Sequence, residues 1–138
     1  QGLLETAEGP ATPALFPSLP VEVYPLYHLF ADLAELRGGE IVEVRSDQPE
    51  AAVGLGFLDA GGVHILLANL TPHALRVVVA PWPDGAGNLR RLDDGNALQA
   101  MRDPAGYRRE ATPASASEGS LQLTLAPFAT IRLSSSAG

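Results

Sequence analysis

The sequence predicts a mainly β protein: an antiparallel β-sandwich of about seven or eight strands with one N-terminal α-helix packed against it. The first observation is a single stretch near the N-terminus whose apolar residues recur at helical spacing. The second is a change of that spacing to a period of two, which then holds in several short runs. Turn-forming residues separate these runs by about 8–12 residues, a spacing typical of sandwiches.

The first twenty residues favour an extended, loop-like path. Prolines recur between Pro10 and Pro20, and proline disrupts a helix. We expect one short strand in this region, at Gly2–Glu5.

The helix is expected over about residues 24–37. Leucines and Phe30 recur through it at helical spacing and form an apolar stripe. Pro25 suits the first turn, where its missing N–H has no partner to lose. Gly38 and Gly39 follow the last apolar residue and end the helix.

After the helix, six runs indicate strands because apolar residues alternate or cluster in them. Residues 111–120, rich in Ala, Ser, Thr and Pro, are expected to form a surface loop. The six predicted strands are Glu40–Arg45, Val53–Leu58, Val63–Leu70, Leu75–Ala80, Leu121–Leu125 and Ala129–Leu133.

Turns connect these runs. Asp59–Gly62 is typical of a hairpin turn, Thr71–His73 joins the next pair, and Pro83–Gly85 closes another. Asp93–Asn96 predicts a further turn, with Asn96 placed to cap a short helix over Ala97–Arg102.

Composition and charge exclude several functions. The 138 residues carry nine basic and sixteen acidic side chains, and the formal charge of −7 is the wrong sign for nucleic acid or an anionic membrane. Cysteine is absent, which excludes disulfides, thiol nucleophiles and thiolate metal sites. No stretch approaches about 18 apolar residues, so no membrane span is expected. With neither an initial Met nor a basic leader, we expect an excised, cytoplasmic piece.

The three histidines, His28, His64 and His73, are the first candidates for chemistry, since imidazole can act as acid, base or ligand. His28 falls within the predicted helix, where a packed histidine is the more common case. His64 and His73 are nine residues apart, which does not match a local metal pair. We expect no metal site.

The acidic candidates are Glu5 and Glu8, because a pair of carboxylates roughly 5–10 Å apart can cleave a glycosidic bond. Nothing in the neighbouring sequence would desolvate them, so solvated side chains are expected. Asp93–Asn96 lacks the ligand spacing of a calcium loop. The serines lack a Gly-x-Ser-x-Gly nucleophile elbow, so no hydrolase signature is present.

Two further motifs have structural explanations. Gly54–Gly56 lies within a predicted strand, which favours a bulge or tight packing between sheets over a phosphate loop. Asn69–Thr71 fits a glycosylation sequon, but we expect it to be the end of a strand. Trp82 and Tyr107 are the aromatic candidates for a sugar platform, although aromatic residues make up only 6% and a rim or core-edge position is favoured for Trp82.

Three segments carry a resemblance to a known family. Val23–Leu33 resembles the last helix of the barrel in clan-A glycoside-hydrolase-like proteins, where that helix leads into a β-sandwich. Val63–Thr71 and Leu125–Leu133, after Gly38 and Gly39, resemble strands of that sandwich. The closest resemblance is to the D-apionate lactonase family, sugar-acid lactone hydrolases built on a glycosidase-like barrel.

The resemblance covers nearly the whole chain and implies its domain organisation. Gly2–Thr6 would correspond to the eighth barrel strand and Leu15–Ser18 to the loop before the last helix. Residues 1–38 would then be the remnant of the last strand, loop and helix of a (β/α)8 barrel, and residues 39–138 a C-terminal β-sandwich domain. A complete barrel needs about 250 residues, so the chain is expected to be the C-terminal fragment of a longer enzyme.

The function expected on this basis is non-catalytic: the sandwich buttresses the barrel of a carbohydrate-active hydrolase, either glycosidase-like or a sugar-acid lactonase. The catalytic carboxylates of earlier strands would be outside the chain, and Glu5 is assigned no role. We therefore expect no catalytic residue, cofactor or metal. One alternative is a carbohydrate-binding module that uses Trp82 or Tyr107, and another is a free-standing enzyme that uses Glu5, Glu8 or a histidine.

The expected partner is the missing N-terminal barrel, with no nucleic acid and no membrane. Without the barrel, an apolar patch should be exposed and allow self-association. This patch is expected near Leu3, Leu15, Phe16 or Leu26.

Overall fold

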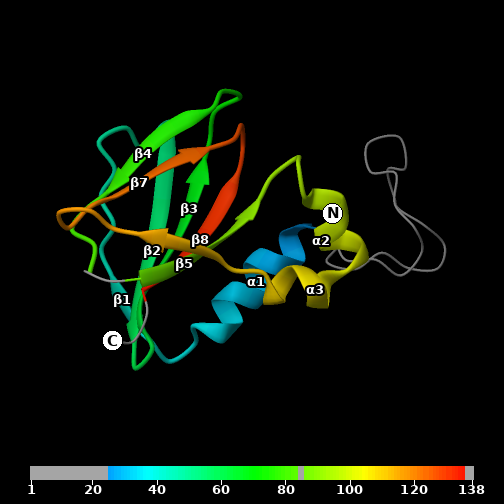
Figure 1. The fold of residues 1–138 in the computed structure, drawn as a ribbon, viewed down its shortest axis with the longest axis horizontal. Helices are drawn as coiled ribbons and strands as arrows, with labels where there is room; N and C mark the ends of the chain where they lie inside the picture. The colour runs from blue at the N-terminus through cyan, green and yellow to red at the C-terminus, as the bar shows by residue number, and fades with distance from the viewer. Residues whose placement is uncertain (1–24, 84–85, 136–138) are drawn as a thin grey trace. The chain divides into compact units, whose positions relative to one another are not determined.

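The computed structural model describes residues 25–83 and 86–135 of the chain. It divides into two compact units, each described here by itself. The helical unit comprises residues 25–37 and 94–110, and the sandwich unit comprises residues 38–83, 86–93 and 111–135 (Figure 1). The predicted division into a barrel remnant and a sandwich domain stays a prediction.

The sandwich unit contains two antiparallel sheets, which confirms the predicted fold class. Six strands form the larger sheet in the order β1-β2-β3-β8-β5-β6, and β4 pairs with β7 in the smaller one (Figure 1). The strands are β1 Glu40–Val42, β2 Ala52–Asp59, β3 Gly62–Asn69, β4 Leu75–Val79, β5 Ala86–Leu92, β6 Thr112–Ser115, β7 Leu121–Leu125 and β8 Thr130–Ser135.

The core lies between the two sheets. In the larger sheet, Leu133 of β8 is opposite Ile65 of β3 on one side and Leu89 of β5 on the other. These side chains point to one face because directly opposed residues of an antiparallel pair share a face. The buried core comprises Ile65, Leu67, Trp82, Ala114, Leu121, Leu125, Ala129, Ile131 and Leu133.

Three strands differ markedly from the prediction. No strand was predicted over Ala86–Leu92, which form β5. Residues 112–115 were expected to lie in a loop, but they form β6, which pairs with β5 along Ala86–Leu89. Ala114 is buried in the core, so even a segment of small residues contributes a packed position. The first strand is shorter than expected and ends at Val42 rather than Arg45. The predicted turn at Pro83–Gly85 includes residues outside the described part of the chain.

Gly54 and Gly56 are explained by close packing rather than by a bulge, since β2 keeps a regular register with β3. A Cβ atom on Gly56 would lie 2.6 Å from Cγ2 of Val42, and one on Gly54 would lie 2.8 Å from Cδ2 of Leu67. Neither position has space for a side chain without displacing a neighbour.

The outer face of β1 and β2 carries exposed apolar side chains. Ile41 is 77% exposed and Leu55 is 52% exposed, and Val53 lies two residues from Leu55 on the same face of β2. We call Ile41, Val53 and Leu55 the outer patch. The patch predicted near Leu3, Leu15, Phe16 or Leu26 falls on side chains outside the described part of the chain.

The helical unit consists of α1 (Pro25–Glu35), α2 (Ala97–Arg102) and α3 (Pro104–Arg109). The first two confirm the predicted helices, whereas α3 was not predicted. Asn96 stands before α2 without a side-chain capping hydrogen bond. Asp103 instead caps α3, because its Oδ1 accepts a hydrogen bond from the Gly106 amide at 3.0 Å. None of the described helices has the length and apolarity that crossing a membrane requires.

Candidate functional site

The histidine expected to be packed, His28, is buried in the helical unit at 1% exposure. Its Nε2 lies 2.7 Å from the backbone carbonyl oxygen of Ala100 in α2. A carbonyl only accepts, so Nε2 carries the proton and Nδ1 is left as an acceptor. The ring also packs against Tyr107 of α3, with centroids 4.3 Å apart. His28 therefore joins all three helices.

Arg108 completes this cluster. Its Nη2 donates to Asp32 Oδ1 at 2.8 Å and to Glu35 Oε1 at 2.6 Å, both on α1. Its Nη1 donates to the carbonyl of His28 at 3.3 Å. Burial lowers the pKa of Arg108, but the hydrogen bonds and negative charges of Glu35 and Asp32 together raise it by more, so the net shift is upward. The cation and its carboxylates hold α3 to α1, which is a structural role.

His64 lies at the end of the sandwich unit where β2 and β3 form their hairpin. Its Nε2 is 2.9 Å from Asp59 Oδ1, and its Nδ1 is 2.9 Å from Ser134 Oγ in β8. The hydrogen bond from His64, followed by that from the Gly61 amide, lowers the pKa of the Asp59 carboxyl.

The order Asp, His, Ser is that of a hydrolytic triad, but here the Asp59 and Ser134 side chains link a hairpin to β8 on the outer face of the larger sheet. The His64 side chain is only 11% exposed. We interpret the three residues as a structural link. His73, in contrast, is exposed, and its backbone carbonyl accepts hydrogen bonds from Asn69 and Thr71.

Asn69 is the last residue of β3, as expected from its sequence context, and it is 2% exposed. Its Nδ2 donates to the carbonyls of His73 at 2.8 Å and Ala126 at 2.9 Å. Its Oδ1 accepts from both the amide and the hydroxyl of Thr71. The side-chain amide thus bonds the loop that contains His73 and the loop that contains Ala126, and it is too buried to be glycosylated.

The aromatic candidates for a sugar platform are both buried, Trp82 at 3% and Tyr107 at 2% exposure. Neither ring has a free face for a pyranose to stack on, which contradicts the platform interpretation. Trp82 packs in the sandwich core and is consistent with the core-edge position. Glu5 and Glu8 lie outside the described residues.

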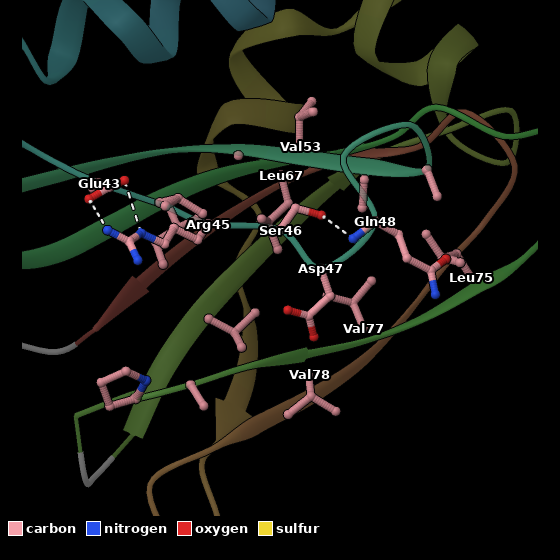
Figure 2. Close-up of a pocket in the computed structure, with 18 of the residues that line it drawn as sticks. Glu43, Arg45, Ser46, Asp47, Gln48, Val53, Leu67, Leu75, Val77 and Val78 are labelled. Atoms are coloured by element: carbon pink, nitrogen blue, oxygen red, sulfur yellow. Dashed lines mark hydrogen bonds and ion pairs between the residues drawn. The ribbon is translucent and has the colours of Figure 1, made fainter.

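The described residues of the sandwich unit form a groove with a volume of about 830 Å³. One wall is β4, and the other consists of residues 42–48 and the inner face of β2 and β3 (Figure 2). Val77 points into the space, whereas Val53 and Val78 point away from it (Figure 2). The groove was not predicted from the sequence, because its walls come from segments that are separated along the chain.

Three of the charged residues at the groove, Glu43, Arg45 and Asp47, lie on its extended wall, and Arg76 lies on β4. Arg45 Nε donates to Glu43 Oε1 at 3.0 Å, and the two side chains are 84% and 70% exposed (Figure 2). A pair this exposed contributes little stability. Within residues 25–83 and 86–135, no group of three or more His, Asp or Glu side chains could hold a metal ion.

Comparison with protein families shows to which family the chain belongs. Residues 49–133, more than half of the chain, match the family described as D-apionate lactonase, C-terminal immunoglobulin-like domain. The chain belongs to this lactonase family. The match confirms the resemblance to this family that was inferred from the sequence. It covers β2 to β8 up to Leu133.

The lactonase-family chain is similar in fold to one part of each of two larger solved enzymes. A GH30 endoxylanase from Clostridium papyrosolvens C71 has a TM-score of 0.65 at 12% identity, over 83% of this chain and 28% of that one. CelM2, a bifunctional glucanase-xylanase from a metagenome library, has a TM-score of 0.56 at 14% identity, over 71% and 18%. At such identities the likeness concerns the fold alone. No match was found among curated proteins.

Proposed function

We propose that this chain is a non-catalytic accessory domain that buttresses the catalytic barrel of a carbohydrate-active hydrolase, with a sugar-acid lactonase as the favoured parent. The observation that carries the proposal is the match of residues 49–133 to a C-terminal domain of the D-apionate lactonase family. The chain spans 28% and 18% of the two enzymes it resembles in fold, which supports a catalytic part elsewhere in a longer polypeptide.

The chemistry of the described residues supports the same proposal. The buried histidines hold helices and strands together, as His28 with Arg108 and His64 with Asp59 do. The outer patch, in turn, is apolar surface that a neighbouring domain would cover. A packing role requires surfaces of this kind and needs no catalytic group.

The test compares three proteins: the parent enzyme, a variant of the parent that lacks residues 39–138, and the isolated chain. The isolated chain should not hydrolyse sugar lactones or chromogenic glycosides. The truncated enzyme should unfold at a lower temperature than the parent, because its barrel has lost a packed neighbour. Hydrolysis by the isolated chain, lost in His64→Gln, would contradict the proposal.

A further inference from the structure

The two sheets of the sandwich differ in width, and each strand of the smaller sheet has a hydrogen-bonded partner on one side only. The larger sheet has six strands and the smaller has only β4 and β7. On the side away from β7, β4 borders the groove. Among the described residues, no backbone hydrogen bond joins β4 to the segment 43–48 across it. A row of peptide groups on β4 is therefore open to pairing.

The groove walls are suited to a polypeptide strand. Val63, Ile65 and Leu67 of β3 line the side of the larger sheet, and Val77 and Val79 of β4 line the other. The residues of β4 alternate between half-buried and exposed, as in a strand that has one face on a core. An extended segment with apolar residues at every second position would bury those residues between the walls and pair its backbone with β4.

We propose that the groove receives one β-strand from a part of the longer polypeptide outside residues 1–138, which extends the smaller sheet at β4. This inference rests on the proposed function, since it assumes a parent enzyme. The strand would be about as long as β4, which has five residues. It would supply the attachment through which the sandwich is held to the rest of the enzyme.

A second copy of this chain is disfavoured as the occupant. Each copy carries a formal charge of −7, so two copies repel each other. A strand from the same polypeptide has no such cost for the whole molecule, and its high effective concentration favours docking.

Hydrogen exchange at single-residue resolution tests the proposal on the parent enzyme and on chain 1–138. In chain 1–138, only the β4 amides that pair with β7 should be protected. In the parent enzyme, the alternate amides among Leu75–Val79 should become protected as well, by at least about tenfold in exchange rate. Equal exchange of these amides in both proteins would overturn the proposal.

The exchange pattern also separates this inference from the proposed function. If β4 stays unchanged but the outer patch becomes protected in the parent, the accessory role stands and the strand proposal fails. If no amide of the domain gains protection, both fail. If β4 protection in chain 1–138 rises with protein concentration, the occupant is a second copy and the proposal is wrong.

A variant pair provides a second measurement. Ala52 is half-buried, lines the groove and shares a face with Gly54 of β2, so Ala52→Glu places a charge where the apolar strand would dock. Thr124→Glu adds the same charge on an exposed position of β7 that does not line the groove. In the parent enzyme, Ala52→Glu should abolish the extra β4 protection and Thr124→Glu should keep it. Equal protection in the two variants would overturn the proposal.

Discussion

The side-chain amide of Asn69 donates a hydrogen bond to the backbone carbonyl of Ala126 at 2.9 Å, across 57 positions of sequence. The same amide holds the carbonyl of His73 in the loop between β3 and β4. A backbone pair supports the junction, since the Phe128 amide donates to the carbonyl of Thr71 at 3.0 Å. One buried side chain thus fixes the loops at which the chain passes between the two sheets.

Replacing Asn69 with Ala should therefore lower the free energy of unfolding by about 3 kcal/mol, because several buried polar groups lose their partners at once. Asn88→Ala is the control, since Asn88 is an exposed asparagine in β5. Urea denaturation followed by circular dichroism measures both. Similar losses in the two variants would show that the junction does not carry this stability.

Arg108→Met should destabilise the helical unit by roughly 2–3 kcal/mol. The substitution keeps much of the apolar stem but removes the guanidinium of Arg108 from the buried carboxylate of Asp32, which is 7% exposed. Arg109→Met, an exposed neighbour in α3, should change stability by less than about 0.5 kcal/mol. Hydrogen exchange of the α1 amides reports the effect within this unit, and equal exchange in both variants would contradict the assignment.

Trp82 should tolerate Phe better than Ala. Among the residues that the structure describes, its Nε1 has no hydrogen-bond partner, so Phe loses no bond to them, and we expect a cost of about 1 kcal/mol. Ala would leave a core cavity and cost about 3–5 kcal/mol. Thermal unfolding compares the two variants. As Trp82 is the single tryptophan and is buried, wild-type emission should not respond to sugars. Quenching by a sugar would restore the carbohydrate-binding interpretation.

The Asp59 carboxylate should make the free energy of unfolding depend on pH in the acidic range. Its pKa is lowered from the ordinary 3.8 in the folded protein by its hydrogen bonds to His64 and Gly61. The unfolded chain therefore binds a proton at higher pH than the folded one, and the stabilisation is lost as the pH falls below 3.8. Asp59→Asn should flatten this loss between about pH 5 and pH 2, measured by urea denaturation. Asp47→Asn, at an exposed carboxylate, should retain it.

The strands that could be predicted are those whose side chains alternate visibly. β7, Leu121–Leu125, has the expected bounds because its leucines face the core and polar residues separate them. β5 was not predicted, since its sequence places Arg90 and Arg91 side by side and lacks apolar alternation. Only its pairing with β8 and β6 makes it a strand, and that information lies elsewhere in the chain.

The candidate sites, too, could be predicted only as far as local sequence determines them. The packed state of His28 could be expected from its place on a helix, but its partners Ala100 and Arg108 are 72 and 80 positions away. Likewise, the groove is formed by residues 42–48, by β4 and by the inner face of β2 and β3, and these segments lie on opposite walls only in the folded chain. Long-range pairing, rather than local propensity, determines these features.

The position of β8 has a consequence for biosynthesis. It is the last of the eight strands that the structure describes, yet it lies between β3 and β5 in the larger sheet (Figure 1). On the ribosome, β1, β2 and β3 can pair as they emerge, and so can β5 and β6, but the two halves stay separate until residues 130–135 have left the exit tunnel. During that interval the apolar run Ile65–Leu67 borders an open strand edge, where a chaperone or a second nascent chain would bind.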